Sequence, residues 1–147
     1  MDYLEYPTAD SWEERRAWFE RTNEKYAGQG SYLVSEQACA LLAEVQASYC
    51  TGAWIAVVVL AFSVVDAQLR ETEVLEFRGN TASLIDKAGA NPQLQQLRKF
   101  RNRIVHIDLN SPAVTVDDQW FRRDELEFKA REAVELMFEA FYISPSV

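Results

Sequence analysis

Three side chains that can act together on a phosphate ester stand close together in the sequence, at Arg101, Asn102 and His106. Histidine titrates near neutrality, so its imidazole can accept or donate a proton as a general base or acid. Arginine keeps its charge and can hold a phosphate through two parallel hydrogen bonds. On a helix, Asn102 lies one turn before His106 and can hydrogen-bond the imidazole, holding its orientation. This pattern predicts proton transfer at a bound phosphate.

The sequence around these residues separates into an apolar and a cationic face if residues 92–107 form one helix. At about 100° per residue, the apolar side chains share one arc and the polar ones another. The predicted core arc holds Leu97, Phe100, Ile104 and Ile107. The other arc holds Arg98, Arg101, Asn102, Val105 and His106, continued by Lys99 and Arg103. Phosphate binding and simple solvation are equal alternatives for Arg98, Lys99 and Arg103. Val105, apolar within the polar arc, predicts contact with a second copy of the chain.

The elements that must position this segment are predicted to be helices of a single domain. The chain has 147 residues, of which 48% are hydrophobic, with only five glycines and four prolines, which suits helices better than a many-turned β-sandwich. The β-branched run 57–59 could be a buried strand, but the apolar pattern continues beyond it with helical spacing. The predicted elements are a helix from Asp10-Ser11 to about Tyr26, one long helix or two in tandem over 31–77 with a kink at Thr51-Gly52, helices over 82–87 and 92–107, a small extended piece at 114–116, and a helix beginning at Asp124-Glu125.

Charge and cysteine usage limit the classes of protein to consider. A net charge of −8 argues against a protein that coats nucleic acid, although a local basic patch remains compatible with it. Cys39 and Cys50, about 16 Å apart along a helix, cannot bond to each other and are predicted to be reduced core thiols of a cytoplasmic protein. With one histidine and no CxxC pair, we expect no metal site and no cofactor. The Asp117-Asp118 pair is therefore interpreted as a solvated turn.

No membrane segment is expected. The apolar run 53–65 has about thirteen residues, short of the roughly 20 that cross a bilayer. Residues 1–5 have neither the basic nor the apolar region of a signal peptide. Nucleotide-fold enzymes and α/β-hydrolases are poor candidates, because the sequence contains no P-loop, no Rossmann glycine fingerprint and no GxSxG motif.

The segment Arg101-Asn102-Arg103-Ile104-Val105-His106 resembles the Arg-polar-x-x-x-His motif of the HEPN superfamily. It follows a long apolar stretch that ends in the acidic residue Asp66, a placement that is also similar to that family. The resemblance spans roughly residues 31–142. It implies an all-α, four- to five-helix up-and-down bundle that forms a dimer, with 31–143 as the HEPN-like core and 1–30 as an N-terminal helical extension.

The resemblance also implies an activity, that of a metal-independent endoribonuclease. Arg101 and His106 of two protomers would face each other, and cleavage would leave a 2′,3′-cyclic phosphate. His106 would move protons, Arg101 would stabilise the phosphate and Asn102 would orient the pair. Two protomers would also supply the two histidines that a base and an acid require, which one chain cannot. The sequence pattern alone, apart from the resemblance, suggests that Asp66 could support the site by pairing with Arg98 or Arg101 if the long apolar helix packs against the motif helix.

Two other interpretations stay open at the level of sequence. One is a non-catalytic helical dimer that binds RNA, a nucleotide or a protein partner, because family membership does not fix activity. The other is a purely structural role for the motif as an interface. The family resemblance also implies that the protein acts in defence or in a toxin–antitoxin system. Its expected partner would then be an antitoxin or a nucleotidyltransferase.

Overall fold

The computed structural model describes residues 6–145, and this part of the chain is all-helical, without a β-strand, as predicted. The elements are α1 (Ala9–Ala27), α2 (Glu36–Thr51), α3 (Trp54–Gln68), the π-helical turn η1 (Leu69–Glu73), α4 (Thr81–Lys87), α5 (Gln93–Val105), α6 (Val116–Phe121) and α7 (Arg123–Phe141). Residues 1–5, where no signal peptide is expected, lie outside the described part. No helix within residues 6–145 is both long and apolar enough to span a membrane.

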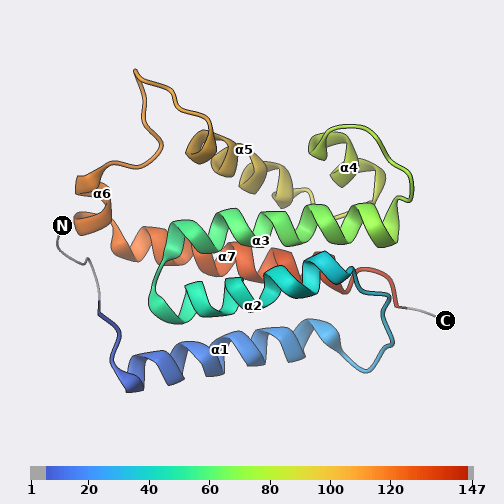
Figure 1. The fold of residues 1–147 in the computed structure, drawn as a ribbon, viewed down its shortest axis with the longest axis horizontal. Helices are drawn as coiled ribbons and strands as arrows, with labels where there is room; N and C mark the ends of the chain where they lie inside the picture. The colour runs from blue at the N-terminus through green and yellow to red at the C-terminus, as the bar shows by residue number, and fades with distance from the viewer. Residues whose placement is uncertain (1–5, 146–147) are drawn as a thin grey trace.

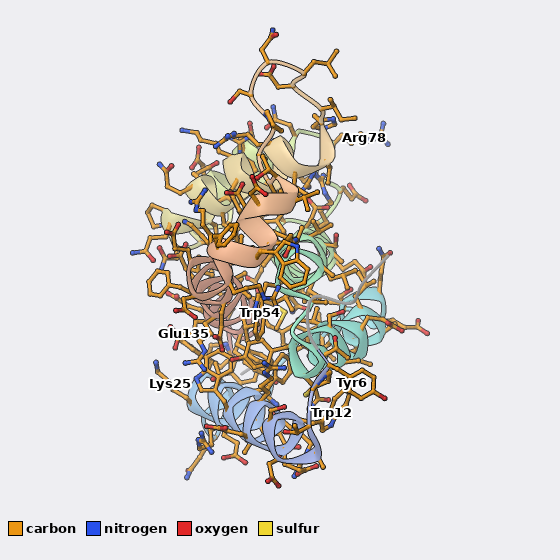
Figure 2. The ribbon with its side chains drawn as sticks, turned by 90° about the vertical axis from the view of Figure 1, so that its left-hand side faces the viewer. Tyr6, Trp12, Lys25, Trp54, Arg78 and Glu135 are labelled. Carbon is orange, nitrogen blue, oxygen red and sulfur yellow. The ribbon has the colours of Figure 1, made fainter. Side chains whose placement is uncertain are left out.

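One hydrophobic core joins α1, α2, α3 and α7, which lie side by side (Figure 1), and it also includes buried residues of α4 and α5. Helix α2 packs against α1 and α3, and α7 packs against α3 and α1, so each of the four helices has two neighbours in the ring. Apolar residues that recur at helical spacing on α7 are buried: Leu126, Ala130, Ala133, Val134, Met137, Phe138 and Phe141. Helix α1 contributes Phe19 to the same core, and its Lys25 lies 3.9 Å from Glu135 of α7 (Figure 2). The segment treated as an extension in the sequence therefore packs as part of this core.

The corner between α2 and α3 divides residues 36–68 into two helices in tandem, one of the two alternatives predicted. Gly52 ends α2 in the left-handed conformation (φ 79°), which glycine adopts without steric cost. Arg123 of α7 donates a 2.9 Å hydrogen bond to the carbonyl oxygen of Gly52, and Arg15 of α1 donates one of 3.2 Å to that of Cys50. Both guanidinium groups also lie over the ring of Trp54, at 5.0 Å for Arg15 and 5.6 Å for Arg123. Helices α1 and α7 thus fasten the same corner.

A buried amide holds the other end of α3. The side chain of Gln68, 1% exposed, accepts a 2.9 Å hydrogen bond from the Ser35 amide and donates to the Leu33 carbonyl at 2.9 Å and to the Thr72 hydroxyl at 3.0 Å. These bonds join the N-terminus of α2 to the π-helical turn that follows Gln68. Because Ser35 also caps α2, one side chain fixes the start of α2 and the end of α3 together.

The helix that carries the motif is shorter than predicted. Helix α5 ends at Val105, and His106 is extended (φ −114°, ψ 112°) rather than helical. Ile107, predicted to be a core residue, is 85% exposed as a result. A turn follows in which the Asp108 side chain accepts from the Asn110 amide and the Asp108 carbonyl accepts from the Ser111 amide. Such local bonds compete with helix continuation, which explains the early end of α5.

Two smaller predictions are also corrected. Cys39 is exposed on α2 and is not a core thiol, whereas Cys50 is buried, and neither is in a disulfide. The extended piece expected at 114–116 is absent, because Val116 begins α6 and Thr115 caps it. Thr115 and Asp118 form a reciprocal capping box, and Asp118 also pairs with Arg122 at 3.3 Å. The Asp117-Asp118 pair therefore belongs to a helix start rather than to a solvated turn.

Candidate functional site

Arg101 is the motif residue that lies against the ring of the buried Phe62 on α3. Leu94 and Leu97 are buried and anchor α5, which packs against α3. The guanidinium of Arg101 lies 5.0 Å from the centre of the ring of Phe62 on α3. Its Nε is buried and has no hydrogen-bond partner within residues 6–145, and no carboxylate there pairs with it. A half-buried cation without an acidic partner is suited to receive an anionic ligand.

Two adjoining hollows open at Arg101. The first, called here the Arg98 hollow, has a volume of about 200 Å³ and is lined by Asn80, Thr81, Ala82, Arg98, Arg101 and Asn102. The second, called the Asp66 hollow, has a volume of about 460 Å³ and is lined by Gln37, Ser63, Asp66, Ala67, Arg70, Glu71, Thr81 and Arg101. The two adjoin because Thr81 and Arg101 line both. Arg101 therefore stands on the boundary between them.

Asp66 lines a hollow with Arg101, but its partners differ from those predicted. Its carboxylate accepts a 2.9 Å hydrogen bond from Nε of Arg70, one turn later, and a 2.8 Å bond from the hydroxyl of Thr81. The Nε of Arg98, the other predicted partner, donates to Gln95 at 3.0 Å. The prediction that Asp66 pairs with Arg98 or Arg101 is therefore wrong. Because Arg70 takes this charge, Arg101 is left without an acid.

The structure brings together only part of the predicted phosphate-binding set. Arg98 and Asn102 line the same hollow as Arg101. Arg103 lines a different hollow, of about 230 Å³, beneath the loop that follows α5. Lys99 is exposed and lines neither of the hollows at Arg101. Donors suited to phosphate are therefore gathered at Arg98, Arg101 and Asn102.

His106 stands apart from this group within one chain. It is exposed at the start of the loop 106–115, which projects from the end of α5 (Figure 1). It lines neither of the two hollows, and no hydrogen bond links its imidazole to the Asn102 side chain. Exposed apolar side chains surround it in sequence, with Val105 at 44%, Ile107 at 85% and Leu109 at 90% exposure. His106 thus lies on an open, partly apolar surface.

Two residues that complete the Asp66 hollow were not predicted. Arg70 comes from the π-helical turn, and Thr81 from the start of α4. Two signals for them exist in the sequence: the Asp66–Arg70 spacing of four, which pairs charges on a helix, and the helix start at Asn80-Thr81. Neither signal indicates that α4 packs beside α5.

Within residues 6–145, no three His, Cys, Asp or Glu side chains are grouped so that they could hold a metal ion. The chain matches no protein-family model, no curated protein and no solved structure.

Proposed function

We propose that this chain is a metal-independent endoribonuclease of the HEPN type that works as a homodimer. Arg101, Asn102 and His106 would be the catalytic residues, and Arg98 would bind substrate phosphate beside them. The same proposal includes an up-and-down bundle as the family fold and a cytoplasmic location. It also includes a role in defence, with a partner such as an antitoxin or a nucleotidyltransferase. RNA is the substrate class because its 2′-hydroxyl supplies the internal nucleophile.

The observation that carries the proposal is the unpaired guanidinium of Arg101. Its buried Nε lacks a hydrogen-bond partner, and the Asp66 carboxylate nearby is occupied by Arg70 and Thr81. Leaving a buried donor unsatisfied costs about 1–3 kcal/mol, so such a group is expected where a ligand completes it. A phosphate in the hollow would accept from the terminal nitrogens of Arg101, and the Arg98 and Asn102 side chains would add further donors.

The position of His106 supports a site shared by two chains. The imidazole is on an exposed surface flanked by Val105 and Ile107, which are 44% and 85% exposed. Pairing of two such surfaces would bury the apolar side chains and bring the His106 residues of both chains toward the arginines.

Cleavage would then need only groups of the two protomers. One His106 would accept the proton of the 2′-hydroxyl as that oxygen forms a bond to phosphorus. The other His106 would donate a proton to the 5′-oxygen as its bond to phosphorus breaks. Arg101 would stabilise the negative charge on the phosphoryl oxygens. The products are a 2′,3′-cyclic phosphate and a 5′-hydroxyl.

The test is cleavage of a mixed RNA substrate by the purified protein in EDTA. We expect the wild type to cut and leave cyclic-phosphate ends, with the rate reduced at least about a hundredfold by His106→Ala and by Arg101→Met. Arg21→Ala serves as the matched control, because Arg21 is exposed on α1 and lines neither hollow. Equal cutting by the wild type and His106→Ala would refute the proposal, as would no cutting by a folded dimer.

A specific observation favours a second candidate, a dimer that binds RNA without cutting it. His106 lies outside both hollows that Arg101 lines, so a single chain does not combine a proton-transfer group with the anion site. On this alternative, Arg101→Met would weaken retention of RNA at low salt, while His106→Ala would leave both retention and RNA length unchanged.

A further inference from the structure

A separate hollow lies where α5, α6 and α7 meet, away from Arg101. It is called here the Phe100 hollow, and none of its lining residues lines the Arg98 or the Asp66 hollow. Its residues come from α5, from the segment 113–114 near the end of the loop after α5, from α6 and from the first turns of α7 (Figure 1). Its volume of about 410 Å³ lies within the range of about 300–1,000 Å³ typical of small-molecule sites.

Half of the residues that line the Phe100 hollow are apolar, and two of these are aromatic. Phe100 is half-buried on α5, Leu126 is buried on α7, and Phe128 of α7 is 66% exposed. Ala113 and Val114 add aliphatic groups. An apolar ligand would cover part of the Phe128 ring that is now open to water, and removal of this surface from water favours binding. The hollow therefore suits a ligand with an apolar body.

One of the three carboxylates that line the hollow is left without a cation. The other two, Glu125 and Asp118, are both engaged by Arg122, whose guanidinium lies 2.6 Å from the former and 3.3 Å from the latter. The remaining carboxylate, that of Asp124, makes no ion pair within residues 6–145. A positively charged group of a ligand would therefore be attracted to Asp124.

Lys129 does not reverse this charge balance, because its own partner lies outside the hollow. Its Nζ is 3.8 Å from the carboxylate of Glu132, which is not a lining residue. The same Nζ is 5.6 Å from the centre of the Phe100 ring, so this aromatic wall already has a cation over it. An anionic ligand would meet more carboxylates than cations, on a chain whose net charge is −8.

We propose that the Phe100 hollow binds a small organic cation, an ammonium group carried on an aromatic body. The aromatic body packs against Phe100 and Phe128, and the ammonium group pairs with Asp124. This site does not depend on the proposed function, because no residue of the Arg101–His106 motif and none of the hollows at Arg101 contributes to it. Its ligand has the opposite charge to the phosphate expected at Arg101, so the two sites take different compounds.

The experiment compares three indole compounds of similar shape and different charge, by NMR titration of the full chain at low salt and neutral pH. The probes are tryptamine, which carries an ammonium group, tryptophol, which carries a hydroxyl, and indole-3-propionate, which carries a carboxylate. We expect tryptamine to bind about threefold to fivefold more tightly than tryptophol, the ratio that one exposed ion pair provides, and at least about tenfold more tightly than indole-3-propionate. In about 1 M salt, the ratio of tryptamine to tryptophol affinity should fall below about twofold, because salt screens the ion pair.

Two variants with matched controls test the two ends of the ligand separately. Asp124→Asn should weaken tryptamine at least about threefold and leave tryptophol unchanged, whereas Asp117→Asn is the control, because Asp117 is an exposed acid of α6 that does not line the hollow. Phe128→Ala should weaken both tryptamine and tryptophol at least about threefold, through loss of the aromatic contact. Its control is Phe121→Ala, because Phe121 is 83% exposed and is not a lining residue. Thermal unfolding of all four variants verifies that they are folded.

The outcomes are independent of whether the protein cuts RNA. Preference for tryptamine that disappears in Asp124→Asn but persists in Asp117→Asn supports the proposal. Equal binding of the three compounds, preference for the carboxylate, or absence of binding by all three overturns it. Loss of tryptamine binding as the chain self-associates at higher protein concentration would show that a second copy covers the hollow, and this result also overturns the proposal.

Discussion

Replacement of Arg101 by methionine is expected to stabilise the protein while it removes function. The buried Nε without a partner costs about 1–3 kcal/mol in the folded state. Methionine removes that cost and keeps an unbranched side chain against Phe62. It gives up the contact of the guanidinium with the ring, which is 5.0 Å away and worth about 0.5–1 kcal/mol at a partly exposed site. A sulfur–aromatic contact of about 0.3–1.5 kcal/mol offsets much of that loss.

The net expectation for Arg101→Met is an increase of about 1 kcal/mol in the free energy of unfolding, or about 3 °C in Tm for a chain of this size. Urea unfolding followed by circular dichroism measures it, with Arg98→Met as the matched control on the same helix. The Nε of Arg98 already has a partner in Gln95, so Arg98→Met should not raise the free energy of unfolding by more than about 0.5 kcal/mol. If Arg101→Met is no more stable than Arg98→Met, the guanidinium is satisfied and the reasoning fails.

Three further predictions concern the core and its corners. Gln68→Ala should lower the free energy of urea unfolding by about 2–4 kcal/mol, because it leaves the Ser35 amide and other buried groups without partners. Gly52→Ala should cost about 1–2 kcal/mol in the same assay, and Gly52→Asn less, because φ at this position is 79°. Burial raises the pKa of Tyr49 to about 12, against 10 for an exposed tyrosine. The folded state then holds a proton that the unfolded state loses, so stability should fall by about 2–3 kcal/mol between pH 10 and 12, and Tyr49→Phe should lack this component of the fall in a series of urea titrations.

The helices of the core were predictable because their signals are local. Helix α7 combines acids in its first turn with apolar residues at helical spacing, and the seven apolar residues given above for this helix are buried. Gly28 and Gly52 mark the ends of α1 and α2 for a similar reason, since glycine readily adopts the conformation that ends a helix.

The site was less predictable because its geometry depends on features that a helical projection omits. Placing Ile107 in the core and His106 beside Asn102 assumed a helix to residue 107, whereas the turn at Asp108 ends it at Val105. The pairing of Asp66 with Arg70 follows from spacing, but the hydrogen bond from Thr81 depends on tertiary packing. Cys39 lies on the outer face of α2, which periodicity could not establish in an alanine-rich segment with little polar contrast.

The packing of α7 against both α1 and α3 determines when the chain can fold during synthesis. Residues 123–141 supply nine buried side chains to a core whose other helices, α1 to α5, all precede residue 106. A ribosome must therefore translate through residue 141 before the apolar face of α3 can be covered. Until then the face of α3 that α7 covers is exposed in the nascent chain, and a chaperone that binds apolar segments is expected to engage residues 54–68.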